Sequence, residues 1–168
     1  MNEMQKILGK TMSKLSVGSK APDFILLRSP GKQITLSEEL KKGPVVLVFY
    51  PADFTSVCQT ELCQFRDDLA DYNDLGASIL GISVDSIFSH AAFAKAHKIQ
   101  FPLLSDWEKT TIRDYDVVFP DLAGMTNVAK RSVFVIDQEG LIQYVWVSEH
   151  PGNLPPFDAI KNAVERLN

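Results

Sequence analysis

Two uninterrupted apolar runs dominate the hydrophobic pattern of the chain. They are residues 45–50 (VVLVFY), which are apolar throughout, and 78–84 (SILGISV), which has the same character apart from two serines, and both are rich in β-branched residues. Runs of this kind, without polar alternation, are typical of strands that are covered on both faces of a sheet. A helical stretch of about fifteen residues separates them, so the pattern predicts a strand, a helix and a second strand parallel to the first.

Shorter segments on both sides extend this unit. Turn clusters between apolar segments predict two hairpins, formed by 24–28 with 33–36 and by 132–136 with 141–147. Apolar residues at helical spacing predict helices over 57–73, 87–98, 106–115 and 157–167, whereas 116–130 shows no clear period. The order predicts one α/β domain over residues 18–168, with a mixed central sheet and helices on both faces.

The first seventeen residues are expected to form an N-terminal extension. Met4, Ile7, Leu8, Met12 and Leu15 recur at helical spacing. The extension is therefore either an amphipathic helix or a tail that becomes ordered on docking, and the pattern does not distinguish the two.

Composition and charge narrow the class of protein. The chain has 168 residues, of which 45% are hydrophobic and 23% charged, and its net charge is −4. This composition is typical of a globular protein, and the acidic balance argues against a nucleic-acid partner. Apolar stretches of membrane-spanning length are absent from the sequence, and we expect no membrane association.

The two cysteines, Cys58 and Cys63, indicate redox use of thiols. A small secreted protein would carry several disulfides, so this usage favours a cytoplasmic protein. Zinc is disfavoured because neither C-x-x-C spacing nor a cluster of histidine ligands is present, and we expect no metal or cofactor.

Helix geometry predicts different surroundings for the two thiols. Cys58 falls in the first turn of its predicted helix, where free N–H groups and the helix dipole stabilise an anion such as a thiolate. At 100° per residue, Cys58 lies on the apolar face and Cys63 points roughly 140° away, toward solvent or a partner. Five residues of helix separate two Cα atoms by about 7.5 Å along the axis, so a disulfide would require the first turns to unwind.

The segment 51–61 (PADFTSVCQTE) resembles the peroxiredoxin motif P-x-x-x-[TS]-x-x-C followed by an acidic residue. Further segments match the same family in order: 21–24 (APDF), 101–106 (FPLLSD) and 131–137 (RSVFVID). The resemblance extends from about residue 18 to the C-terminus. It implies a thioredoxin-like fold with an N-terminal hairpin extension, and an enzyme that reduces hydroperoxides.

The resemblance also implies a role for each residue of the site. Cys58 would be the peroxidatic nucleophile that becomes a sulfenic acid, and Thr55 would place its hydroxyl against the sulfur and the peroxide. Pro51 would shield the sulfur from water. Arg131 would stabilise the thiolate and the leaving hydroxide, and Glu61 would orient Arg131.

Two subgroups of the family are similar to this sequence. A second cysteine five residues after the first, here Cys63, resembles the bacterioferritin comigratory protein or peroxiredoxin Q subgroup, in which it resolves the sulfenic acid as an intramolecular disulfide. Segments 54–62 and 115–131 instead resemble the one-cysteine alkyl hydroperoxide reductase E subgroup, in which Cys63 would be a bystander.

The expected partners are a hydroperoxide and a thioredoxin-type dithiol reductant, in a monomer or homodimer. A non-enzymatic alternative is a thioredoxin-fold redox or holdase module, for which the amphipathic first fifteen residues are the only indication.

Overall fold

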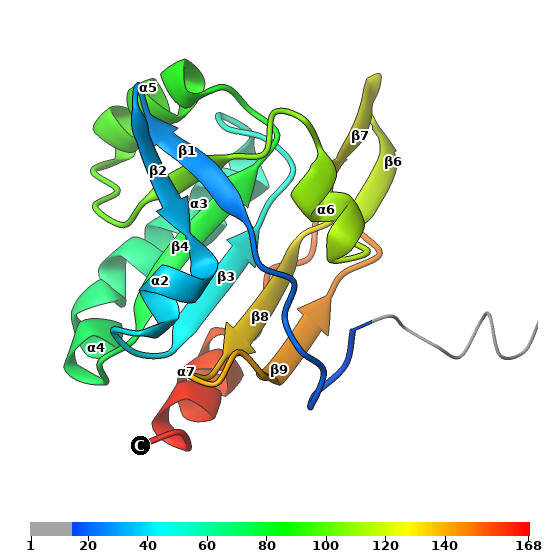
Figure 1. The fold of residues 1–168 in the computed structure, drawn as a ribbon. Helices are drawn as coiled ribbons and strands as arrows, with labels where there is room; N and C mark the ends of the chain where they lie inside the picture. The colour runs from blue at the N-terminus through cyan, green and yellow to red at the C-terminus, as the bar shows by residue number, and fades with distance from the viewer. Residues whose placement is uncertain (1–14) are drawn as a thin grey trace, which may run out of the picture.

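The computed structural model describes residues 15–168. The predicted N-terminal helix or tail lies almost wholly outside this range. Within it, a single sheet of seven strands forms the centre, in the spatial order β2-β1-β5-β4-β3-β8-β9 (Figure 1). The strands are β1 (Ile25–Ser29), β2 (Lys32–Thr35), β3 (Val45–Phe49), β4 (Ser78–Ser83), β5 (Leu103–Ser105), β8 (Ser132–Ile136) and β9 (Ile142–Val147).

The sheet is mixed, as the sequence predicts. β3, β4 and β5 are parallel, whereas β8 is antiparallel to β3, and the hairpins β1–β2 and β8–β9 form the two ends of the sheet. Every residue of β3 is buried. Successive side chains of this strand enter different hydrophobic clusters, Val45, Leu47 and Phe49 on one face and Val46 and Val48 on the other. Burial on both faces is the physical reason why the run contains no polar residue.

Helices cover both faces of this sheet. They are α2 (Leu36–Leu40), α3 (Ser56–Asp67), α4 (Leu69–Asp74), α5 (Ile87–His97), α6 (Thr110–Asp114) and α7 (Phe157–Glu165). Buried residues of α3, α4, α5 and α7 join the cluster with Val46 and Val48, whereas those of α2 and α6 join the cluster with Leu47. No helix in residues 15–168 combines the length and the hydropathy of a membrane-spanning segment.

The prediction of one helix over 57–73 is wrong in one respect. The helix is divided at Asp68, which ends α3 and precedes α4 with φ −88° and ψ −1°. Aspartate is a weak helix former because its side chain competes for local hydrogen bonds. Here its carboxylate accepts from Gln64 Nε2 at 3.2 Å and lies 3.8 Å from Lys161 Nζ.

The segment 116–130, for which no regular structure was predicted, contains a hairpin. Its strands, β6 (Val118–Leu122) and β7 (Met125–Ala129), form a separate two-stranded sheet that projects beside α6 (Figure 1). Ala123 and Gly124 form the turn with φ 51° and 90°, and Asp121 Oδ1 accepts from the Gly124 N–H at 2.8 Å. Alanine rarely takes a positive φ, so the sequence carries no strong turn signal here.

Candidate active site

The topology brings distant segments together where β3 ends. Phe49, the last residue of β3, pairs with Ser132, the first residue of β8. Because the two strands are antiparallel neighbours, the loop that follows β3 lies beside Arg131, which precedes β8. Arg131 and Cys58, which are 73 residues apart in the sequence, are therefore in direct contact.

The N-terminus of α3 has no side-chain cap. Thr55 occupies the N-cap position, but its hydroxyl donates to the Ala52 carbonyl at 3.0 Å instead of accepting from the helix. The first-turn N–H groups of an α-helix have no partner within the helix, and they carry the positive end of its dipole. Cys58 lies in this turn, so the backbone favours negative charge on its sulfur.

Cys58 is 1% exposed, and its sulfur contacts a buried cation. Nη1 and Nη2 of Arg131 both donate to Cys58 Sγ at 3.4 Å. Arg131 is 2% exposed, and its Nε and Nη2 also donate to the Pro151 carbonyl at 3.1 and 2.7 Å. The guanidinium is thereby fixed in one orientation, with two of its nitrogens directed at the sulfur.

Glu61 completes this buried charge cluster. One carboxylate oxygen, Oε2, accepts from Arg131 Nη1, whereas Oε1 is buried without a hydrogen-bond partner among the described residues. Burial raises the pKa of Glu61 to about 7, although Arg131 opposes the shift. Burial lowers the pKa of Arg131, but the charges of Glu61 and Cys58 outweigh it and raise that pKa overall.

A cavity of about 310 Å³ opens onto Cys58. Pro51, Thr55 and Arg131 line it from the predicted site. Because the Thr55 hydroxyl donates its proton to Ala52, it presents an acceptor lone pair to the cavity. It is therefore suited to accept a hydrogen bond from a bound ligand that carries an O–H group.

Cys63 lies apart from this group. It is half-buried, whereas Cys58 is fully buried, and both thiols are free. Arg66, one turn further along α3, donates to Asp67 and to the His97 carbonyl. The pKa of Arg66 is raised first by its hydrogen bond to Asp67, with a smaller contribution from Cys63. Helix α3 is continuous through both cysteines, as the predicted separation of the two thiols requires.

The structure thus brings five of the six predicted site residues together and leaves Cys63 outside. Sequence reasoning missed the opposite wall of the cavity, which is formed by Leu122, Ala123, Met125, Pro151 and Gly152. Three of these belong to the unpredicted β6–β7 hairpin, and no periodic signal pointed to them. The remaining two follow β9 in a loop whose proline carbonyl accepts from Arg131.

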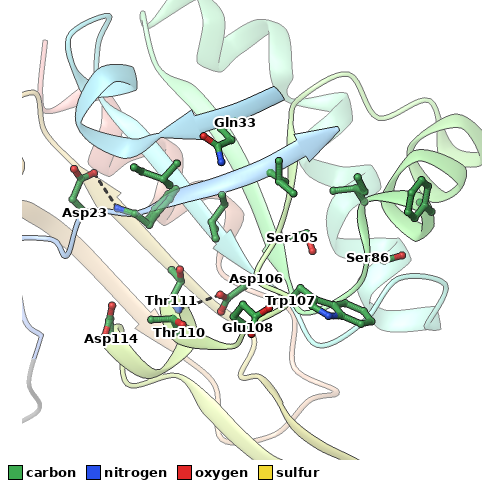
Figure 2. A pocket seen from close by; sticks show the side chains of 16 residues that line it. Asp23, Gln33, Ser86, Ser105, Asp106, Trp107, Glu108, Thr110, Thr111 and Asp114 are labelled. Atoms are coloured by element: carbon green, nitrogen blue, oxygen red, sulfur yellow. Dashed lines mark hydrogen bonds between the residues drawn. The ribbon is translucent and has the colours of Figure 1, made fainter. Parts of the chain in front are cut away.

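A larger cavity, of about 730 Å³, lies between β1, the start of α5 and α6 (Figure 2). Two of its carboxylates serve the fold, since Asp23 accepts from the Phe24 and Ser37 N–H groups and Asp106 accepts from the Thr111 and Ile112 N–H groups. No cysteine lines it. Although this cavity is larger than the one at Cys58, it contains no thiol and is therefore not the candidate active site.

Comparison with solved structures defines the class of protein. BcpB, a peroxidoxin from Mycobacterium tuberculosis, is 34% identical with a TM-score of 0.82, covering 92% of this chain and 99% of that one. PrxQ of Xylella fastidiosa is 26% identical with a TM-score of 0.79, covering 90% of this chain and 96% of that one. The fold is therefore the thioredoxin-like fold of peroxiredoxins, as the resemblance implied.

Sequence comparison then gives the family. The model of the AhpC/TSA family matches residues 17–145, so the chain belongs to that family. A chloroplastic peroxiredoxin Q from Triticum aestivum is 42% identical over 138 residues, 82% of this chain. A chloroplastic 2-cysteine peroxiredoxin from Chattonella marina var. antiqua is 40% identical over 144 residues, 80% of this chain. The match covers 62% of the Triticum protein and 71% of the Chattonella protein. The resemblance to peroxiredoxins is confirmed, and the comparisons support the peroxiredoxin Q subgroup.

The prediction of a cytoplasmic protein is contradicted by these relatives. Both sequence relatives are named as chloroplastic proteins. Cysteine usage separates disulfide-rich secreted proteins from proteins with free thiols. It does not separate the cytoplasm from another compartment in which thiols stay reduced.

Proposed function

We propose that this chain is a thiol-dependent peroxidase that reduces hydrogen peroxide and organic hydroperoxides at Cys58. The observation that supports this proposal most directly is the buried Cys58 sulfur, which faces a cavity at a helix N-terminus and lies 3.4 Å from two nitrogens of Arg131. A buried thiolate is stable only beside compensating charge, and the guanidinium and the helix dipole provide it.

In the first step, the Cys58 thiolate attacks one oxygen of the hydroperoxide. An S–O bond forms as the O–O bond breaks, so the sulfur is oxidised and the peroxide is reduced. The distal oxygen leaves as hydroxide or alkoxide and takes up a proton to give water or alcohol. Arg131 stabilises the charge on both oxygens, while Thr55 orients the peroxide and Pro51 excludes water.

In the second step, the Cys63 thiol attacks the Cys58 sulfenic acid. An S–S bond forms, the S–O bond breaks, and one water molecule leaves with the thiol proton. Two Cα atoms five residues apart on a continuous helix are separated by about 7.5 Å along its axis, and their side chains diverge. The first turns of α3 therefore unwind before this step.

In the third step, a thioredoxin-type dithiol reduces the disulfide by thiol exchange and is itself oxidised. This cycle requires no metal or cofactor. We also propose that residues 18–168 form the catalytic domain and that residues 1–17 are an N-terminal extension to it.

Peroxide consumption with excess dithiol tests the proposal. Wild-type protein is expected to turn over, and Cys58→Ser to be inactive; equal rates in the two would refute the peroxidase function. Intact mass after one equivalent of peroxide tests the role of Cys63. Loss of two hydrogens, abolished by Cys63→Ser, supports the intramolecular disulfide, whereas gain of oxygen in the wild type supports a one-cysteine enzyme.

A further inference from the structure

A second cluster of titratable side chains lies where the loop between β3 and α3 meets the loop after β4 and helix α5. Asp53, Asp85 and His90 each present a polar atom within 4.8 Å of the others. Asp53 is 7% exposed and His90 is 2% exposed. None of the three lines the cavity at Cys58. Asp53 nevertheless lies between two residues that do, Pro51 and Thr55.

Hydrogen bonds from three elements fix Asp53. Its Oδ1 accepts from the Tyr50 hydroxyl at 2.6 Å, and its Oδ2 accepts from Ser89 Oγ at 2.9 Å. Its backbone N–H donates to Asp85 Oδ2 at 2.9 Å, and this oxygen also accepts from Ser83 Oγ at 2.5 Å. The side chain and the backbone of this loop residue are thus both anchored. Because hydrogen-bond donors already occupy these carboxylate oxygens, the cluster is better suited to holding the loop than to binding a metal ion.

His90 closes the network with both ring nitrogens. Nε2 lies 3.0 Å from the Leu104 carbonyl, an acceptor, and Nδ1 lies 2.8 Å from Asp53 Oδ2. Nε2 is thus placed to donate to this carbonyl, and Nδ1 is a hydrogen-bond partner of the carboxylate. With both nitrogens paired, the buried ring leaves no polar atom without a partner, and it ties the loop to α5.

Helix α5 holds the next loop residue as well. Phe54 has φ 63°, a conformation that bulky residues rarely adopt. Its ring packs edge-on against Phe93 at 5.2 Å between centroids and lies 6.4 Å from the His97 ring. Two consecutive residues of the loop, Asp53 and Phe54, therefore contact one helix, although Phe54 stays 55% exposed.

We propose that Asp53 and His90 are positioning residues for peroxide reduction. Through their mutual hydrogen bond, and through Tyr50 and Ser89, they hold the loop in the shape that aligns Pro51 and Thr55 with the Cys58 sulfur. The inference rests on the proposed peroxidase function. It concerns residues that act through the loop and do not contact the peroxide.

The test compares two reactions of Cys58 in a Cys63→Ser background, so that one thiol reacts. The first is oxidation by hydrogen peroxide, which depends on the alignment of Thr55 and Pro51. The second is alkylation by iodoacetamide, which depends on the thiolate but not on that alignment. In Asp53→Ala, the ratio of the peroxide rate to the alkylation rate is expected to fall at least tenfold. A merely structural role would leave this ratio unchanged in the folded protein.

Asp53→Asn is the conservative rescue. Its amide oxygen accepts from Tyr50, and its two amide N–H groups donate to His90 Nδ1 and to Ser89 Oγ, so the contacts of the loop are kept without the carboxylate. The rate ratio is expected to stay within threefold of wild type. A loss as large as that in Asp53→Ala would overturn the proposal.

Asp137→Ala is the matched control. Its carboxylate also accepts three hydrogen bonds, from Glu139 N, Leu141 N and Gln143 Nε2, but it lies at the other end of β8 from Arg131. The ratio in this variant is expected to stay within threefold of wild type. If the rate ratio falls equally in the control and in Asp53→Ala, the effect comes from general destabilisation, and the positioning role is refuted.

Tyr50→Phe keeps the proposal testable if Asp53→Ala does not fold. It removes one hydrogen bond to Asp53 and keeps the ring that stacks on Phe93. We expect the ratio to fall three- to tenfold, and an unchanged ratio would overturn the inference.

If the starting protein lacks Cys58-dependent peroxide reduction, the proposed function fails and the inference with it. If that reaction is present and the variants leave the ratio unchanged, only the positioning role fails.

Discussion

Replacing Arg131 by methionine tests the electrostatic basis of the site. Methionine keeps an unbranched apolar stem and removes the guanidinium. Both N–H contacts to Cys58 Sγ, each 3.4 Å long, are then lost. A hydrogen bond to a charged group contributes about 1.5–3 kcal/mol, and the lower value suits contacts to sulfur of this length. Two such contacts sum to about 3 kcal/mol, which corresponds to about a hundredfold loss in the rate of peroxide reduction.

The same substitution leaves Glu61 buried without its cation. Breaking one partner of a buried ion pair destabilises a protein by about 3–5 kcal/mol, unless the remaining group becomes neutral. Since burial already raises the pKa of Glu61 to about 7, the carboxyl group becomes protonated once Arg131 is removed. The expected loss of unfolding free energy is therefore near the lower end of that range.

The double variant Arg131→Met/Glu61→Gln separates the two effects. It removes the cation at the sulfur and also removes the unpaired carboxylate. Stopped-flow competition for hydrogen peroxide should give the same hundredfold loss in the single and the double variant, whereas denaturant unfolding should show most of the stability restored in the double variant. A double variant that reacts with peroxide within threefold of the wild-type rate would refute the role given to Arg131.

Four further outcomes are expected. The pKa of Glu61 is raised from 4.5 to about 7 in the folded state, so this group favours folding at pH 4.5 and loses that contribution, about 3 kcal/mol at most, as the pH rises through 7. Glu61→Gln should therefore flatten the pH dependence of the unfolding free energy measured with denaturant. Parallel pH profiles for the variant and the wild type would contradict this. Thr55→Val, which removes the hydroxyl at nearly constant shape, should lower the peroxide rate constant about tenfold or more while Thr55→Ser retains it. Met125→Ala removes apolar surface from the cavity wall and should lower the preference for cumene hydroperoxide over hydrogen peroxide about fivefold, measured as a ratio of rate constants. In the disulfide form, hydrogen exchange should show α3 amides losing protection while α4 amides keep theirs; equal loss in both helices would contradict the division at Asp68.

The elements that the sequence predicts best are those whose burial is unambiguous. β3 and β4 were predicted because both of their faces pack against helices, so polar and apolar residues do not alternate along them. α5, also predicted, begins at a side-chain N-cap, since Ser86 Oγ accepts from the Ser89 N–H at 3.1 Å. In these cases local propensity, capping and burial agree.

The elements that were missed depend on long-range packing. The division at Asp68 is reinforced by Lys161 from α7, which no local pattern contains. The β6–β7 hairpin turns at Ala123, a residue type with little tendency toward positive φ. The hydrogen-bond partners of His90 come from the loop after β3 and from β5. Spacing along one element cannot predict such partners.

The division at Asp68 limits how far the proposed unwinding extends. Helix α3 has twelve residues, and freeing Cys58 and Cys63 to meet removes its helical structure from Ser56 to Cys63. The four residues that remain before Asp68 form one turn, which is too short to persist as a helix in water. Helix α4 begins separately, and its Tyr72 is fully buried in the core beside Phe65 of α3. The oxidised sulfur also loses the negative charge that binds Arg131, which weakens the contact that holds the first turn in place. Oxidation of Cys58 would thus loosen α3 as one unit, while the rest of the domain retains its fold for the reaction with a reductant.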